Sequence, residues 1–160
     1  MHFFSFRKAP TASYPGIPEE QHVCITTEFG DIMIELFPDN APDTVANFKK
    51  LERSSFYDGL CFHRVIPGFV AQGGNPKGDG TGGPGYKIRA EFNVRRHHRG
   101  TVAMARAADP VSAGSQFYIC YVDLPHLDGK YTIFGQVVQG MDIVDRLRAG
   151  TVMERAIAVP

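Results

Sequence analysis

Hydrophobic and polar residues alternate with a period of two at the start of the chain's folded part. In residues 31–37 every second side chain from Ile32 to Leu36 is aliphatic, which is typical of a strand with one buried face. Residues 22–27 have a similar strand-like composition, and residues 28–30 between the two segments are suited to a turn. The pattern therefore predicts a β-hairpin.

Strand-like segments continue through the rest of the chain at turn spacing. They are rich in aromatic and β-branched residues, which favour strands. They cover residues 62–66, 69–71, 100–106, 114–121, 131–138 and 156–159. Because closing a sheet on itself removes its exposed edges, this series predicts a mainly β protein built as a closed antiparallel β-barrel.

Two segments instead space their apolar residues as a helix does. The buried stripe of the first helix would consist of residues that recur every third position, namely Val45, Phe48 and Leu51. Asn40 is its candidate N-cap, Pro42 suits its first turn, and it should end near residues 53–54. A second helix is predicted at residues 140–148. The two helices are expected to cover the open ends of the barrel.

Length and charge exclude several classes of function. The 160 residues are enough for one domain with a substantial core. Lys and Arg number 17 and Asp and Glu also number 17, so nothing global indicates nucleic acid or an anionic membrane as the main partner. No apolar run approaches the about 18 residues that a membrane span requires.

The three cysteines do not suggest a disulfide framework. Cys24, Cys61 and Cys120 are far apart, and each lies among apolar residues. An odd number of cysteines with this spacing is more typical of buried thiols in a reducing compartment than of a disulfide or a metal site.

Residues 1–20 are expected to be an irregular N-terminal extension of a domain that spans residues 21–160. The apolar run near their start is too short for the core of a signal peptide. Its charges, Arg7 and Lys8, follow the run, whereas a signal peptide has them first. Three prolines then prevent regular structure. The expected location is cytoplasmic.

Residues 78–83 match the G-x-G-x-x-G pattern of dinucleotide-binding proteins, but their context rejects this interpretation. Pro84 and Gly85 prevent a helix from starting there, and no acidic residue lies about 20 positions further on to hold a ribose. The segment is better interpreted as a surface loop whose backbone allows close approach.

The densest charge cluster, residues 95–99, holds three arginines and the adjacent histidines His97 and His98. A contact to a phosphate backbone and a solvated loop are both compatible with it. The solvated loop is favoured, because no stacking aromatics surround the cluster and the domain is neutral. Adjacent histidines in a strand or helix point apart, so they do not form a pair of metal ligands.

Residues 62–74 form the most informative segment of the sequence. The Pro-Gly pair at residues 67–68 predicts a turn between two apolar runs, since proline fixes φ and glycine tolerates a positive φ. Arg64 is unusual, because in an alternating strand it would share a face with Phe62 and Ile66. Either its stem packs while its guanidinium reaches water, or a functional site requires a cation there.

Residues 62–74, FHRVIPGFVAQGG, resemble the signature of the cyclophilin-type peptidyl-prolyl cis-trans isomerases, and bacterial members more than eukaryotic ones. Residues 114–119 (GSQFYI), 127–130 (LDGK) and 134–135 match the same family in the same order. The resemblance implies an eight-stranded antiparallel barrel capped by two α-helices. It also implies an enzyme that needs no cofactor or metal and acts on proline-containing polypeptides and unfolded protein clients. A monomer is expected.

The resemblance also assigns roles residue by residue. It makes Arg64 the catalytic arginine, together with Gln72 and Phe69. The implied substrate-binding residues are Val70, Ala105, Arg106, Gln116, Tyr118, His126, Leu127 and Tyr131. Within this set, Phe69, Tyr118 and Leu127 correspond to the family's proline-binding pocket. Ala105 and Arg106 correspond to the segment that binds the substrate backbone.

Some positions depart from the family's pattern. Val70 stands where many relatives have methionine, and Arg106 where many have asparagine. His126 replaces a tryptophan that helps relatives to bind cyclosporin, so we expect cyclosporin to inhibit this protein weakly. Tyr131 replaces a frequent histidine. Because the reaction needs no general acid, activity should survive that change, and substrate preference is the property open to alteration.

Two functions of different classes remain compatible with the sequence. The first is an isomerase that speeds proline-limited folding, and the second is a non-catalytic proline-peptide-binding module or holdase. The intact Arg64, Phe69 and Gln72 favour the isomerase, because a pure binder has no need of the cation.

Overall fold

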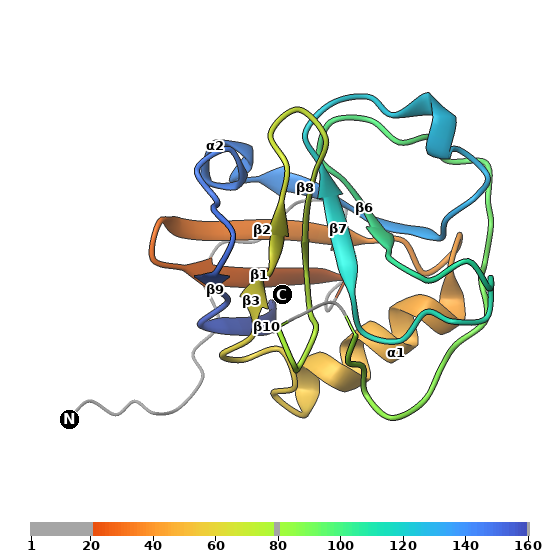
Figure 1. Ribbon diagram of the computed structural model, residues 1–160, viewed down its shortest axis with the longest axis horizontal. Coiled ribbons are helices and arrows are strands. Elements are labelled where there is room, and N and C mark those ends of the chain that lie inside the picture. Colours follow the sequence, from red (N-terminus) through yellow and green to blue (C-terminus); the bar gives the residue numbers. More distant parts are fainter. Residues whose placement is uncertain (1–20, 79–80, 160) are drawn as a thin grey trace.

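The computed structural model describes residues 21–78 and 81–159 (Figure 1). The predicted irregular extension at residues 1–20 lies outside this described part. The strands are β1 (His22–Thr27), β2 (Gly30–Leu36), β3 (Cys61–Phe62), β4 (Arg64–Val65), β5 (Val70–Gly73), β6 (Thr101–Met104), β7 (Phe117–Cys120), β8 (Ile133–Gln139), β9 (Thr151–Val152) and β10 (Arg155–Val159). The helices are α1 (Pro42–Arg53), the short 3-10 helix η1 (Pro125–Leu127) and α2 (Met141–Val144).

Eight strands form one antiparallel sheet in the order β10-β1-β2-β8-β6-β7-β5-β4. The mainly β prediction is therefore confirmed, but the closed barrel is wrong, since no hydrogen-bonded ladder within the described residues joins β4 to β10. β3 and β9 pair with each other in a separate two-stranded sheet. The predicted strand at residues 62–66 breaks at His63, where the chain passes from the short sheet to the large one.

Helix α1 has a different cap from the one predicted. Ala41 occupies the N-cap position and makes no side-chain cap bond, so the assignment of Asn40 is wrong. The carboxylate of Glu91 caps the helix instead, accepting bonds from the backbone N–H groups of Asp43 (3.1 Å) and Thr44 (2.7 Å). A carboxylate at this end also complements the helix dipole. The predicted end near Arg53 and the buried stripe are confirmed.

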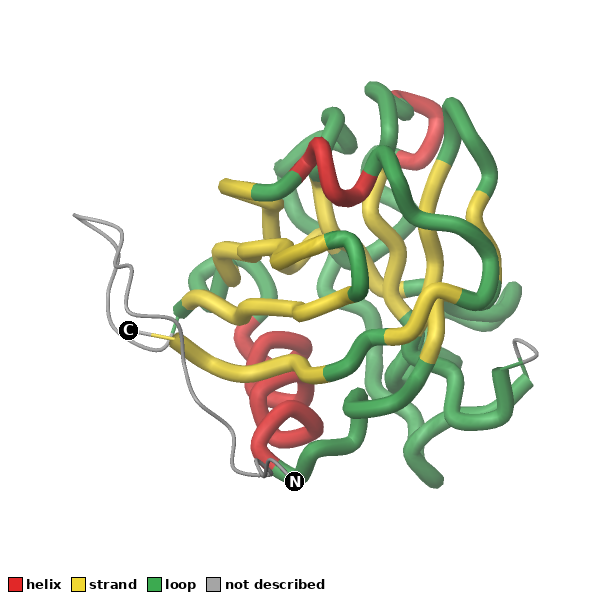
Figure 2. The backbone as a smooth tube through the Cα atoms, turned by 90° about the vertical axis from the view of Figure 1, so that its left-hand side faces the viewer, coloured by secondary structure: helices red, strands yellow, loops and turns green. Residues whose placement is uncertain are grey.

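Helix α2 is shorter than the predicted helix at residues 140–148. After Val144 the hydrogen bonds tighten, because the amides of Arg146 and Leu147 donate to carbonyls three residues back. Figures 1 and 2 both place α1 and α2 at opposite ends of the sheet, as expected. Both helices contribute side chains to the main core, for example Phe48 from α1 and Val144 from α2.

Alternation along β6 and β7 divides the apolar side chains between two faces. One face belongs to the main core and includes Val102, Met104, Phe117 and Ile119. The other face carries a second buried cluster, which consists of Val70, Ala103, Tyr118, Cys120, Leu124 and Ile133. Phe69, Leu127 and Tyr131 pack against this second cluster while staying partly exposed. The second cluster is therefore the floor on which the candidate site is built.

Candidate active site

The hairpin of β4 and β5 places Arg64 directly opposite Gln72. Its predicted turn is confirmed, because the Ile66 N–H donates to the Val70 carbonyl (2.9 Å) and Gly68 has a φ of 75°. That left-handed conformation is one that glycine adopts without the penalty a Cβ would bring. The Pro-Gly pair thus fixes the register that aligns the arginine with the glutamine.

The expected apolar face around Arg64 is wrong. Phe62 is fully buried in β3, but the break at His63 turns Arg64 to the surface, and Ile66 is 36% exposed. The guanidinium carbon lies 5.9 Å from the centre of the Phe69 ring. Arg64 therefore holds its charge at the edge of a partly apolar surface, where no burial penalty applies.

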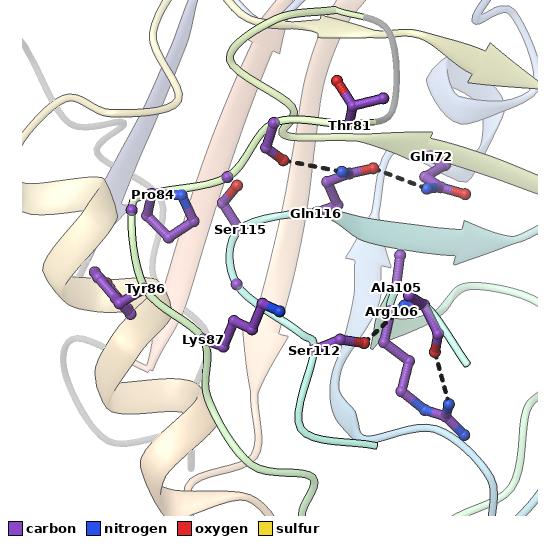
Figure 3. Close-up of a pocket in the computed structure, with 15 residues that line it drawn as sticks. Gln72, Thr81, Pro84, Tyr86, Lys87, Ala105, Arg106, Ser112, Ser115 and Gln116 are labelled. Carbon is purple, nitrogen blue, oxygen red and sulfur yellow. Dashed lines mark hydrogen bonds between the residues drawn. The ribbon is translucent and has the colours of Figure 1, made fainter. Parts of the chain in front are cut away.

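A line of hydrogen bonds fixes the polar side of the site. Arg64 Nη1 donates to Gln72 Oε1 (3.3 Å), and Gln72 Nε2 donates to Gln116 Oε1 (3.0 Å). Gln116 Nε2 in turn donates to the carbonyl oxygen of Gly82 (3.1 Å), as Figure 3 shows. In both glutamines the amide nitrogen points toward Gly82, so the amide oxygen points toward Arg64. The line therefore presents an acceptor to the guanidinium and orients it.

A pocket of about 180 Å³ opens beside Arg64, and we call it the Arg64 pocket. Its lining consists of Arg64, Phe69, Val70, Gln72, Ala105, Arg106, Tyr118, Leu127 and Tyr131. All of these residues are among the predicted site residues, although they come from separate segments of the chain. The lining includes no carboxylate among the described residues, so no anion in the pocket wall neutralises Arg64.

The two remaining predicted residues lie next to the pocket. Gln116 reaches it through the bond to Gln72. His126 is exposed and stacks on Phe69, with ring centroids 6.4 Å apart and an interplanar angle of 17°. The structure thus brings all the predicted site residues into one region.

Arg106 ties together two loops at the pocket's edge. Its Nε and Nη2 donate to the carbonyl oxygen of Lys130 (3.2 and 2.6 Å), and its Nη1 donates to those of Ala107 and Ala108. Its guanidinium carbon lies 4.7 Å from the centre of the Tyr131 ring. These contacts hold the loop after β6 against the loop before β8.

A larger groove of about 740 Å³, which we call the Gln116 groove, adjoins the pocket. It is lined by Gln72, residues 81–87, Ala105, Arg106, Ala107, Ser112, Gly114, Ser115 and Gln116 (Figure 3). Gln72, Ala105 and Arg106 line both spaces. Residues 81–85 accordingly form a wall of the groove, and the backbone carbonyl of Gly82 comes within hydrogen-bond distance of Gln116.

His97 is the residue at the site that the sequence analysis missed. The solvated-loop interpretation is wrong for this residue, which is only 1% exposed. Its backbone N–H and its Nδ1 both contact Asp128 Oδ1 (2.7 and 3.0 Å), and its Nε2 lies 2.8 Å from the hydroxyl of Tyr118. His98 and the arginines of the cluster are exposed, as predicted.

Burial and these bonds shift the titration of all three groups. Burial lowers the pKa of His97 below its usual 6.5, although the Asp128 hydrogen bond opposes the change. Burial would raise the pKa of Asp128, but the bonds from His97 outweigh it and hold that pKa below 3.8. Burial also raises the pKa of the Tyr118 hydroxyl far above its usual range. At neutral pH the group is therefore a neutral imidazole between a carboxylate and a phenol.

Comparison with known proteins decides the family. The sequence model described as "Cyclophilin type peptidyl-prolyl cis-trans isomerase/CLD" matches residues 22–159. The chain belongs to the cyclophilin family.

Bacterial relatives are similar over most of their length. A peptidyl-prolyl cis-trans isomerase of Helicobacter pylori is 47% identical over 140 residues, which cover 85% of each chain. One from Synechococcus elongatus is 53% identical over 128 residues, which cover 79% of this chain and 88% of that protein. This cyclophilin is a peptidyl-prolyl cis-trans isomerase, as the sequence predicted.

A solved cyclophilin has the same architecture. The crystal structure of a cyclophilin-type isomerase from Cryptosporidium parvum, determined in the presence of the dipeptide Ala-Pro, superposes with a TM-score of 0.81 at 32% identity. The match covers 88% of this chain and 99% of that one. Among the described residues of our cyclophilin, no helix has the length and apolar character to cross a membrane.

Proposed function

We propose that Arg64 is the catalytic group of this cyclophilin and that the Arg64 pocket holds the proline ring of the substrate. The observation that carries this proposal is the position of the guanidinium, which Gln72 orients at the mouth of a pocket with aromatic and aliphatic walls. Phe69, Tyr118 and Leu127 give the ring apolar surface, while Arg64 supplies the single charge that the reaction uses.

The chemistry requires no covalent step. Amide resonance imposes a barrier of about 20 kcal/mol on rotation of the Xaa-Pro bond, and the exchange takes tens of seconds or longer without a catalyst. In the twisted amide, resonance is lost and the proline nitrogen gains a lone pair. A guanidinium N–H aimed at that nitrogen makes a hydrogen bond that strengthens only as the bond twists. Each additional ~1.4 kcal/mol of this stabilisation raises the rate about tenfold.

The residues around the pocket would hold the peptide on either side of the proline. We assign Ala105 and Arg106 to the substrate backbone, since both line the pocket and the groove. The pair Gln72 and Gln116 lies between the two spaces, and its amides offer polar partners next to Arg64. Residues that flank the proline would then lie along the Gln116 groove.

Proline-containing polypeptides are the proposed substrates, and unfolded protein clients the proposed partners. The Cryptosporidium structure was determined in the presence of the dipeptide Ala-Pro, which supports the first point by analogy with that protein. A holdase without turnover is the less favoured alternative, because a binding surface alone gives no reason to orient Arg64 through Gln72. Assistance to proline-limited folding follows from the activity if the clients reach the pocket before they fold.

The decisive experiment is NMR exchange spectroscopy on a short Xaa-Pro peptide. Arg64→Ala should reduce the catalysed exchange rate about 100-fold, which is the usual loss when one preorganised donor is removed. Arg64→Lys keeps the charge without the planar fork and should recover only part of the rate. The matched control is Arg148→Ala, which removes an exposed arginine outside both the pocket and the groove. Full activity of Arg64→Ala would contradict the proposal.

A refolding assay separates the isomerase from the holdase. A client whose refolding is limited by proline isomerisation should refold faster with the wild type and at the uncatalysed rate with Arg64→Ala. A holdase would act equally well in both forms, because suppression of aggregation needs no Arg64. The result thus assigns the cellular effect either to turnover or to binding.

We also propose that the protein works as a cytoplasmic monomer without a nucleic-acid partner. The balance of 17 basic and 17 acidic residues supports the absence of a nucleic-acid partner. Cell fractionation, analytical ultracentrifugation and a test for salt-sensitive RNA retention examine the three claims separately.

A further inference from the structure

We propose that His97 is a positioning residue for the Arg64 pocket, joining the wall that carries Tyr118 to the loop that carries Leu127. This inference rests on the proposed role of the pocket in holding the proline ring. Tyr118 lies on β7, whereas Leu127 ends η1. Both side chains line the pocket, and His97 contacts both of these chain segments.

Three hydrogen bonds attach His97 to the η1 loop. The backbone N–H of His97 donates to Asp128 Oδ1 (2.7 Å), and Nδ1 contacts the same oxygen (3.0 Å). The His97 carbonyl accepts from the N–H of Leu124 (3.0 Å). These bonds hold residues 124 and 128, on either side of η1, so Leu127 has little freedom to move relative to His97.

A fourth hydrogen bond attaches His97 to Tyr118. Because the ionised Asp128 only accepts hydrogen bonds, Nδ1 carries the imidazole proton and Nε2 accepts the Tyr118 O–H (2.8 Å). The two rings stack with an interplanar angle of 8°, and Tyr131 lies edge-on to both. Since His97 is 1% exposed and Tyr118 5%, no bulk water replaces this bond if it is lost.

The expected effect is on substrate binding and not on the twisting step. Loosening the link would let the Tyr118 ring and Leu127 move apart, which weakens the grip on the proline ring in every state of the reaction. The Arg64–Gln72 pair lies on β4 and β5 and makes no bond to His97. An interaction that acts equally on substrate and transition state changes affinity and leaves the rate of the bound complex unaltered.

Protonation of His97 should weaken the same link. An Nε2 proton would oppose the hydroxyl proton that Tyr118 directs at it, so the phenol would have to turn its own proton away from the acceptor it has in the structure before its oxygen could accept from Nε2. The other charged or titratable groups that act on the imidazole are Asp128, His126 and Tyr131, and Arg96 in turn lowers the pKa of Asp128. Peptide affinity is therefore expected to decrease as the pH falls below 6.5 to the lowered pKa of His97, where the buried imidazole takes up a proton.

The test compares His97→Asn with the neighbouring, exposed His98→Asn. In the first variant the asparagine amide can still donate to Asp128 from near the Nδ1 position, but it is too short to reach Tyr118. At pH 7.5, His97→Asn should raise the dissociation constant of an Xaa-Pro peptide about five- to tenfold, the range expected for one hydrogen bond. The exchange rate of the saturated complex should stay within about twofold. His98→Asn should change neither quantity.

Two results would overturn the inference. One is a lower melting temperature of His97→Asn with an unchanged dissociation constant, which indicates a merely structural residue. The other is a lower exchange rate at saturation with unchanged affinity. Arg64→Ala is measured in parallel, because a fully active Arg64→Ala would refute the assigned pocket, whereas an inactive one leaves only the role of His97 at issue.

A pH series keeps the inference testable if His97→Asn does not fold. All proteins in the series carry His126→Gln, which removes the second histidine near the pocket. With Tyr118 intact, the dissociation constant should increase as the pH is lowered from 7.5 through the titration of the His97 imidazole, followed by its NMR signals in the same samples, and in Tyr118→Phe this increase should be much smaller, since no hydroxyl opposes the Nε2 proton. The same pH dependence in both proteins, or none in either, would contradict the inference.

Discussion

Arg64 and Gln72 are direct partners on paired strands, and their side chains are joined by a hydrogen bond of 3.3 Å between Nη1 and Oε1. Side chains directly opposite each other in an antiparallel pair lie on the same face of the sheet. The register of the turn around Pro67 and Gly68 therefore sets the direction of the proposed catalytic cation. Gln116 adds to this by engaging the Gln72 nitrogen, so that the amide oxygen remains for Arg64.

Removal of the Gln72 amide should slow catalysis without unfolding the protein. In Gln72→Ala the guanidinium loses its orienting acceptor, and we expect the exchange rate of the saturated peptide complex to fall about tenfold, or ~1.4 kcal/mol. NMR exchange measures this directly. Gln139→Ala, which truncates an exposed glutamine at the end of β8, is the control and should keep the wild-type rate. An unchanged rate in Gln72→Ala would show that Arg64 does not need the hydrogen bond to Gln72 for its orientation.

Cyclosporin should inhibit this cyclophilin weakly, and His126→Trp should restore part of the affinity. The imidazole of His126 stacks on Phe69 at the pocket's edge but offers less apolar surface than an indole. The additional buried area is expected to strengthen binding about tenfold. An inhibition titration of wild type, His126→Trp and the control His98→Trp measures the difference. Nanomolar inhibition of the wild type would contradict the prediction.

Local sequence patterns were sufficient for the elements whose contacts are also local. The hairpin of β1 and β2 follows from alternation, and the turn at residues 67–68 follows from the chemistry of proline and glycine. The break at His63 was not predictable from the pattern, because residues 62–66 are strand-like throughout. Which sheet each half joins depends on its partners, β9 for β3 and β5 for β4. The prediction of a closed barrel was wrong because it depended on such long-range pairing.

The dependence on contacts between distant parts of the chain also explains why the role of His97 was not predicted. His97 carries no local signal, since its neighbours Arg96 and His98 are exposed and its partners are 31 and 21 residues away in the chain. The cap of α1 was not predicted for the same reason, because Glu91 accepts a bond from a backbone amide 48 residues away. The residues of the Arg64 pocket came instead from resemblance to a family, and the structure brings them together.

Folding stability should decrease as the pH falls below 6.5. Burial lowers the pKa of His97 and of His22 in the folded chain, so the unfolded chain binds protons that the folded chain does not. The contribution is complete above the unfolded pKa of 6.5 and is lost as the pH falls toward each folded pKa. Each histidine changes the free energy of unfolding by at most about 1.4 kcal/mol per pH unit.

Urea unfolding at pH 7.5 and 5.5 measures this loss of stability. His97→Asn should reduce the difference between the two pH values, whereas His98→Asn, which removes an exposed imidazole, should leave it as in the wild type. A stability that is independent of pH over this range would contradict the prediction.

Gly140 should tolerate substitution far less well than Gly150, although both have left-handed backbones with φ of 99° and 96°. A Cβ at Gly140 would overlap the carbonyl oxygen of Asp31 in β2, whereas one at Gly150 would meet no atom within 4 Å. Gly150→Ala should cost about 1–2 kcal/mol of backbone strain, and Gly140→Ala about 1–3 kcal/mol more, because β2 and the start of α2 must move apart. Urea unfolding gives both values. An equal loss of stability in the two variants would show that the contact with the Asp31 carbonyl relaxes without a cost in free energy.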